Sequence, residues 1–272
     1  MGALGALLAL GVVAAAHRLT EPPAPTAGVA RVTVSVEAAG LHEVLPTSRG
    51  PVHVYQPPGY DPKTAGVLLY VHGYYTDLAA ACRHHHLTDQ FDASGRNALF
   101  IVPEAPASGA EPVVWGDLPA LLEAVSRHPD FTVPEGRRVA LAHSGGFRTV
   151  ERWLGSGLLD TVVLLDGLYG GERALDGWLK RSGHRRRRLM LVGRETSARV
   201  ERFAARYADR RELDAIPSPG ELGPGGDARV VVVRSDVGHM ELVTQQQAIP
   251  ALLALTRLAP IAGSGPTARG RQ

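Results

Sequence analysis

The chain has 272 residues, of which 44% are hydrophobic and 21% are charged, and its formal net charge is +2. This length suits one α/β domain with a sizeable core and is too short for two such domains. The basic residues are nearly all arginine and form no basic stripe with interleaved aromatic residues, so the composition argues against a nucleic-acid partner. The single cysteine, Cys82, excludes an intramolecular disulfide, and we expect it to be a small buried hydrophobe.

The first 16 residues form an apolar run, and the first charged side chain is Arg18. The run ends in alanines that fit a cleavage site before His17, and residues 20–26 are rich in proline. We expect residues 1–26 to be a secretory signal peptide or a membrane tether with a linker, and the protein to be exported (periplasmic, secreted or membrane-tethered). Because no Lys or Arg precedes the run, a misassigned start codon and a cytoplasmic protein stay open as a second interpretation.

Short apolar runs separated by helical patterns continue along the chain. The expected strands are residues 31–36, 51–55, 66–71, 97–102, 139–142, 161–165, 189–192 and 229–233. The expected helices are residues 77–91, 118–125, 147–158, 174–178, 198–207 and 247–258. The first two strands alternate, as half-buried antiparallel strands at a sheet edge do, whereas the later runs are typical of strands buried on both faces.

Strands that alternate with helices predict parallel β-α-β units wound around one central sheet, with helices on both faces. We expect residues 27–260 to form this single α/β domain and residues 261–272 to be a flexible tail. Residues 212–227, rich in proline and glycine, are the least structured interior stretch. The basic run at residues 184–188 is interpreted as a solvated loop rather than a phosphate or nucleic-acid site.

One motif in the middle of the chain points to chemistry: Ala142-His143-Ser144-Gly145-Gly146, where an apolar strand runs directly into a helical pattern. Such a turn strains the turning residue, so its neighbours must be small, and its side chain stands clear of the sheet. These are the needs of a nucleophile elbow, whose common form is G-x-S-x-G. Ser144 also suits a helix N-cap, but the strand before it and the small residues around it favour a nucleophile.

Polar side chains also follow the other predicted strands. In a parallel sheet, functional groups gather at the carboxyl ends of the strands, so we expect these side chains along one edge. They are His72, Glu104, Ser144, Asp166, Glu195 and His239. Over about residues 30–258 the chain resembles the α/β-hydrolase family, since the chain order serine, acid, histidine is the order of that family's catalytic triad.

The resemblance implies a serine hydrolase of the esterase type. In this assignment Ser144 is the nucleophile and His239 is the base that takes its proton. The resemblance also supplies the oxyanion hole, which consists of the backbone N–H groups of Tyr74 and Gly145.

The acid of the triad has two candidates. The family usually places it after the strand that ends near Glu195, and a variant places it one strand earlier, where Asp166 lies. Because Asp166 comes directly off a buried strand, where an unpaired charge is costly, the sequence favours Asp166.

The expected partner is a small molecule with a carboxylic ester or an amide bond. A peptidase or amidase with the same triad and a non-catalytic binding protein of the cell envelope stay open as alternatives. Residues 167–187 leave little room for a lid, so we expect an open site. No cofactor is expected, and no metal either: the tract His84-His85-His86 is interpreted as a solvated helix, because consecutive helix positions do not share a face.

Overall fold

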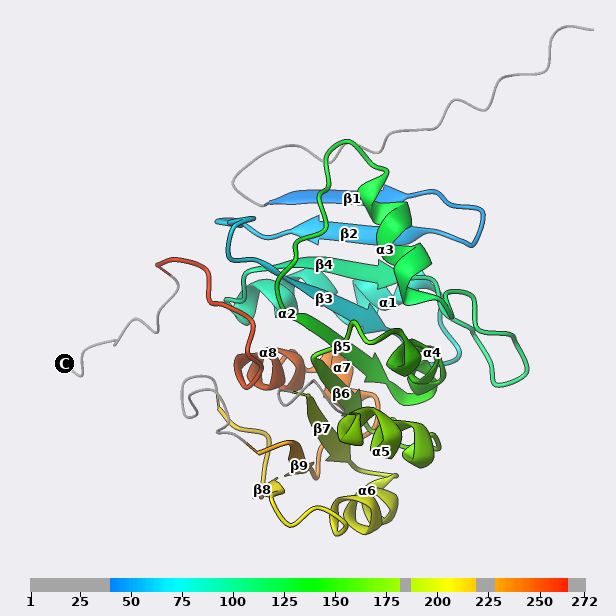
Figure 1. Cartoon of the computed structure of the whole chain (residues 1–272), viewed down its shortest axis with the longest axis vertical. Helices are drawn as coiled ribbons and strands as arrows, with labels where there is room; N and C mark the ends of the chain where they lie inside the picture. Colours follow the sequence, from blue (N-terminus) through cyan, green and yellow to red (C-terminus); the bar gives the residue numbers. More distant parts are fainter. Residues whose placement is uncertain (1–39, 182–186, 219–227, 264–272) are drawn as a thin grey trace, which may run out of the picture. The chain divides into compact units, whose positions relative to one another are not determined.

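The computed structural model describes residues 40–181, 187–218 and 228–263, all of which belong to the unit Thr33–Gln272. Within these residues, nine strands form one sheet in the order β1-β2-β4-β3-β5-β6-β7-β9-β8 (Figure 1). The strands are β1 (Leu41–Leu45), β2 (Val52–Gln56), β3 (Gly66–Val71), β4 (Ala98–Pro103), β5 (Arg138–His143), β6 (Thr161–Leu165), β7 (Arg188–Gly193), β8 (Arg211–Leu213) and β9 (Val230–Arg234). Strands β1 and β2 pair antiparallel at one edge, and from β4 to β8 all neighbours are parallel. The predicted mostly parallel sheet is confirmed.

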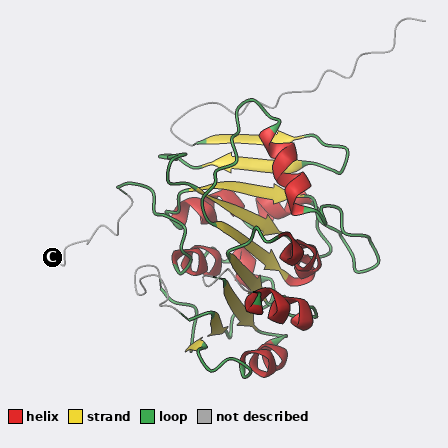
Figure 2. Ribbon diagram, viewed as in Figure 1, coloured by secondary structure: helices red, strands yellow, loops and turns green. Residues whose placement is uncertain are grey.

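Helices cover both faces of the sheet (Figure 2). They are α1 (Leu78–His84), α2 (Leu87–Ala93), α3 (Leu118–Ser126), α4 (Phe147–Trp153), α5 (Glu172–Lys180), α6 (Ser197–Ala204), α7 (Glu241–Thr244) and α8 (Ala248–Ala254). Side chains of α3 to α6 pack in one apolar cluster, and those of α1, α2, α7 and α8 pack in another. Strand β3 contributes to both, because alternate side chains point to opposite faces of a strand. Val67 and Leu69 lie in the first cluster, and Leu68 and Tyr70 lie in the second.

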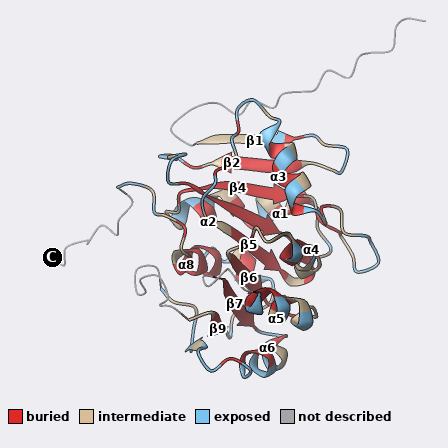
Figure 3. Cartoon of the chain, viewed as in Figure 1, coloured by how far each residue is buried: buried red, intermediate tan, exposed pale blue. Residues whose placement is uncertain are grey.

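Strands β3, β4, β6 and β7 are buried along their whole length (Figure 3). Residues 66–71 and 161–165 form β3 and β6 with the predicted bounds. The predicted strand at residues 31–36 lies outside the described residues. The strand that lies beside β2 is instead β1, which the sequence pattern did not indicate.

The helix predicted over residues 77–91 is in fact two helices. Asp77 caps α1, as expected, with its side chain accepting a hydrogen bond from the backbone N–H of Ala80. His86 then adopts a left-handed backbone conformation (φ 47°), which ends the first helix and starts the second. The prediction of a solvated histidine tract is wrong for His85, which is buried. Its Nδ1 lies 2.9 Å from the hydroxyl oxygen of Tyr70.

The basic run was predicted to be a solvated loop, and this is wrong for its last two residues. Arg187 and Arg188 are both buried. Their guanidinium groups donate hydrogen bonds to the backbone carbonyls of Trp178 and Leu255, respectively. The other residues of the run lie outside the described part of the chain.

Two short elements were missed by the sequence analysis. Strand β8 lies at the start of the stretch expected to be a loop, and α7 begins two residues after His239. Among the described residues, no helix is long and apolar enough to cross a membrane. The signal or tether predicted for residues 1–26 lies outside those residues.

A fully buried glutamine joins the helix α2 to the segment that follows His239. Gln90 donates hydrogen bonds from Nε2 to the carbonyls of His85 (2.5 Å) and Val243 (2.7 Å). Replacing Gln90 by Leu keeps the volume but leaves both buried carbonyls without a donor. We expect Gln90→Leu to lower the free energy of unfolding by about 2–4 kcal/mol, measured by urea titration. Asp89→Asn, at the exposed neighbouring position, serves as the control and should stay within about 0.5 kcal/mol of the wild type.

Candidate active site

Ser144 lies at a sharp turn between β5 and α4. Its backbone is left-handed (φ 50°), a strained conformation for a residue with a side chain. Small residues surround it because the chain approaches itself closely here. A Cβ at Gly145 would lie 2.5 Å from the ring of Tyr74, and one at Gly146 would lie 2.6 Å from the carbonyl oxygen of Val71. This is the geometry expected of a nucleophile elbow.

Tyr74 is held over this turn by an arginine of α4. The guanidinium of Arg148 donates to the hydroxyl of Tyr74 (3.1 Å) and to backbone carbonyls of the loop at residues 108–111 (3.0–3.3 Å). Among the described residues outside the helices and strands, the backbone N–H of Tyr74 has no hydrogen-bond acceptor. The oxyanion hole expected at Tyr74 and Gly145 stays a prediction. The sequence analysis missed Arg148, whose only signal is its place in the first turn after the elbow.

Asp166 follows β6, and it is completely buried in a left-handed conformation (φ 42°). Its carboxylate accepts hydrogen bonds from the backbone N–H groups of Arg194, Glu195 and Thr196, from the hydroxyl of Thr196, and from Nδ1 of His239. Burial opposes the negative charge, but the hydrogen bonds from His239, Arg194 and Thr196 outweigh it and hold the pKa of Asp166 below its usual value. The carboxylate is therefore charged at neutral pH.

His239 lies in the loop after β9, with Nδ1 2.7 Å from Oδ2 of Asp166. Since an ionised carboxylate only accepts hydrogen bonds, Nδ1 carries the proton and Nε2 is the basic nitrogen of the neutral ring. The hydrogen bond to Asp166 is the main reason that the pKa of His239 lies above its usual value, and partial burial opposes it. His239 is thus an oriented base with a stabilised protonated form.

His143, the residue directly before Ser144, supports the loop of His239. Its Nε2 lies 3.0 Å from the carbonyl oxygen of His239, and the two rings lie 4.6 Å apart. Burial lowers the pKa of His143 to about 3, so its ring stays neutral and donates this hydrogen bond. The sequence analysis did not assign a role to His143, because nothing in the sequence pairs it with the distant loop.

The two predicted acids differ clearly in position. Glu195 is 61% exposed, and its Oε2 is 4.0 Å from Nδ1 of His239, beyond hydrogen-bond distance. Oε2 instead accepts a hydrogen bond from the hydroxyl of Tyr169 (3.0 Å). Asp166, Glu195 and His239 together could supply three metal ligands. The fit is poor, because the carboxylate oxygens of Asp166 are already occupied by five hydrogen bonds.

The other predicted strand-end groups form a separate pair. His72 is buried, and its Nε2 lies 3.2 Å from Oε1 of Glu104. The same carboxylate accepts from the backbone N–H of Leu78 at the start of α1 (3.3 Å). This pair fixes the loop that carries Tyr74 and does not contact His239.

Cys82 is half-buried, and a histidine lies beside it. Its Sγ is 3.1 Å from Nδ1 of His53. Burial raises the pKa of Cys82 to about 12 and lowers the pKa of His53 to about 3. Both groups are therefore neutral at physiological pH, which does not suit a cysteine nucleophile.

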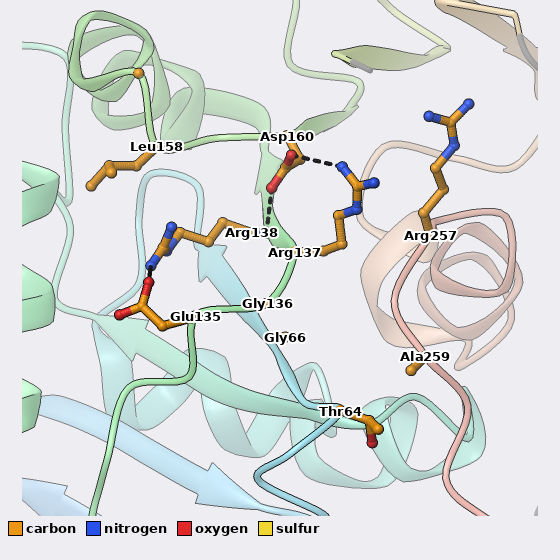
Figure 4. Close-up of a pocket in the computed structure, with 11 residues that line it drawn as sticks. Thr64, Gly66, Glu135, Gly136, Arg137, Arg138, Leu158, Asp160, Arg257 and Ala259 are labelled. Carbon is orange, nitrogen blue, oxygen red and sulfur yellow. Dashed lines mark hydrogen bonds and ion pairs between the residues drawn. The ribbon is translucent and has the colours of Figure 1, made fainter. Parts of the chain in front are cut away.

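A cavity of about 490 Å³ lies where the central strands β3 and β5 begin (Figure 4). It is lined by the first residues of β3 and β5, whereas Ser144 follows the last residue of β5. Its wall contains the ion pair of Arg137 with Asp160 (2.9 Å) and a looser contact of Arg138 with Glu135 (3.6 Å). This cavity is not the site of the chemistry proposed for Ser144.

The close contact of Gly145 with Tyr74 gives a test of the turn. Gly145→Ala should lower the free energy of unfolding by about 1–3 kcal/mol, as overpacking typically does. The ring of Tyr74 cannot simply move away, because Arg148 holds its hydroxyl. Urea titration of Gly145→Ala in a Tyr74→Ala background is the control, and there the effect should fall below about 0.5 kcal/mol. An unchanged loss in that background would show that Tyr74 is not the cause.

No family model and no curated protein matches the sequence. Solved structures do match the fold. A feruloyl esterase module from Clostridium thermocellum is 14% identical with a TM-score of 0.50, over 79% of this chain and 88% of that chain. An S-formylglutathione hydrolase from Agrobacterium tumefaciens is 12% identical with a TM-score of 0.50, over 82% and 95%. A ferulic acid esterase is 10% identical with a TM-score of 0.51, over 78% and 97%. The chain has the α/β-hydrolase fold.

Proposed function

We propose that this protein is a serine hydrolase that cleaves a carboxylic ester in a small molecule through an acyl-enzyme on Ser144. The observation that carries the proposal is the 2.7 Å hydrogen bond between the buried Asp166 and His239, on the sheet edge where Ser144 turns out of β5. The solved structures of similar fold are named as esterases or as an S-formylglutathione hydrolase, which supports ester cleavage as the reaction class.

In the proposed mechanism, Nε2 of His239 removes the proton from the Ser144 hydroxyl as its oxygen attacks the ester carbonyl. The negative charge that develops on the carbonyl oxygen is stabilised by the backbone N–H groups of Tyr74 and Gly145. The protonated His239 then gives its proton to the departing alcohol. In the second half, His239 takes a proton from water as the water oxygen attacks the acyl-enzyme. The carboxylic acid then leaves, and His239 returns the proton to the oxygen of Ser144.

Asp166 is the acid of the proposed triad. It contacts Nδ1 of His239 directly, so it fixes the tautomer that leaves Nε2 basic and stabilises the imidazolium that forms. Glu195 lies farther from the ring and is exposed, so its charge is screened by water. An amide or a peptide bond requires the same groups, and the proposal of an ester rests on the names of the similar structures.

The apolar run at residues 1–16 supports a further part of the proposal, export of the protein across a membrane. The complete set of Ser144, Asp166 and His239 at strand ends argues against a non-catalytic binding protein, because a fold that only binds a ligand needs no such set.

The nucleophile is tested by labelling and by turnover. We expect a fluorophosphonate probe to label Ser144 in the folded protein, with the labelled peptide identified by mass spectrometry. Ser144→Ala and His239→Ala should each lower the turnover of p-nitrophenyl acetate by at least about 10⁴-fold, because the two groups act as one unit. Unchanged thermal unfolding of both variants is the control. Labelling elsewhere, or full activity without Ser144, would overturn the proposal.

The acid is tested by two matched amide substitutions. Asp166→Asn should lower kcat/KM for p-nitrophenyl acetate by about 10⁴-fold, because the amide can hold His239 in the wrong tautomer. Glu195→Gln should lower it by less than about tenfold, since this exposed carboxylate lies 4.0 Å from Nδ1 of His239 and forms no hydrogen bond with it. If Glu195→Gln shows the larger loss, Glu195 is the acid.

A further inference from the structure

Exposed apolar side chains are concentrated around the proposed catalytic residues. Among the described residues, the large hydrophobic side chains that are exposed are Val44, Tyr75, Tyr169 and Met240. Met240 (48% exposed) follows His239 directly, and Tyr169 (40% exposed) has its ring 6.5 Å from that of His239. Exposed apolar side chains next to reactive groups suit contact with a substrate.

The same region carries negative charge. The carboxylate of Glu195 lies 4.0 Å from His239, and it is held there by the hydroxyl of Tyr169. The carboxylates of Glu195 and Glu241 both act to raise the pKa of His239, so both negative charges reach the ring. Arg199, the cation that contacts Tyr169, bonds the backbone carbonyl of Tyr169 and forms an ion pair with Glu172 (3.0 Å).

The mechanism indicates which part of the substrate meets these groups. His239 must deliver a proton to the departing alkoxide, so the alcohol part of the ester lies on the side of His239. The acyl part stays on Ser144, next to the N–H groups of Tyr74 and Gly145. The groups around His239 therefore face the alcohol part.

We propose that Tyr169, Glu195 and Met240 form a subsite for the alcohol part of the ester, and that it takes an alcohol bearing a quaternary ammonium group. This inference rests on the proposed function. The faces of an aromatic ring attract cations, and the hydrogen bond that Tyr169 donates to Glu195 increases the electron density of its ring. The thioether of Met240 adapts to the methyl groups around the nitrogen. Glu195 supplies the opposite charge.

The proposed subsite also predicts which alcohol parts bind poorly. An alcohol part with a sulfonate or carboxylate would approach the carboxylates of Glu195 and Glu241. Like charges at short range reduce binding. A neutral alcohol part of the same shape would be intermediate.

The test compares three thioacetates that release the same type of thiol: acetylthiocholine, its uncharged isostere 3,3-dimethylbutyl thioacetate, and 3-sulfonatopropyl thioacetate. We expect kcat/KM to be about tenfold higher for the cation than for the isostere. The ammonium group gains two attractions at an exposed site, one to the aromatic ring and one to the carboxylate, and their effects on kcat/KM multiply. The sulfonate should be the poorest of the three.

Two variants test which residues cause the preference for the cationic substrate. Glu195→Gln and Tyr169→Leu should each reduce the ratio of cation to isostere to about threefold or less, since each removes one of the two attractions. Glu201→Gln, which removes an exposed carboxylate on α6, is the matched control and should keep the full ratio.

The outcomes separate this inference from the proposed function. Equal kcat/KM for the cation and the isostere, or a ratio that Glu195→Gln leaves unchanged, overturns the ammonium subsite while ester hydrolysis stands. Failure of all three thioacetates, together with a Ser144 that no fluorophosphonate labels, overturns the proposed function itself.

Discussion

The buried carboxylate of Asp166 is the group on which the arrangement of the site depends. It leaves the end of β6, binds three backbone N–H groups after β7 and holds the histidine after β9. One side chain thus connects three neighbouring strand ends. A charge without water is tolerated only with full hydrogen bonding, so this carboxylate requires each of these segments to be in place.

A second set of contacts fixes the other half of the site. Arg148 joins α4 to Tyr74 and to the loop after β4, and His143 joins the end of β5 to the carbonyl of His239. Both residues lie within one turn of Ser144 along the chain. The turn at Ser144 is therefore flanked by two residues that position its surroundings: the charged Arg148 holds Tyr74, and the neutral His143 holds the loop of His239.

The positions of most strands along the chain and the place of Ser144, Asp166 and His239 after strands were predictable, because apolar runs and short motifs are local signals. The choice between Asp166 and Glu195 depends on distances between loops that are far apart in sequence. Burial of His85 and Arg188 was missed for a similar reason. A histidine tract or an arginine run resembles a solvated segment until the tertiary structure supplies a phenol or a carbonyl as a partner.

Ser144 and Asp166 share a left-handed backbone that side chains with a Cβ rarely adopt. Such conformations cost about 1–3 kcal/mol each, and glycine would adopt both with ease. At position 166, however, glycine would leave three backbone N–H groups without their acceptor. Backbone strain at both turns accompanies a hydroxyl and a carboxylate at these strand ends. Efforts to make the protein more heat-resistant should begin away from these two turns.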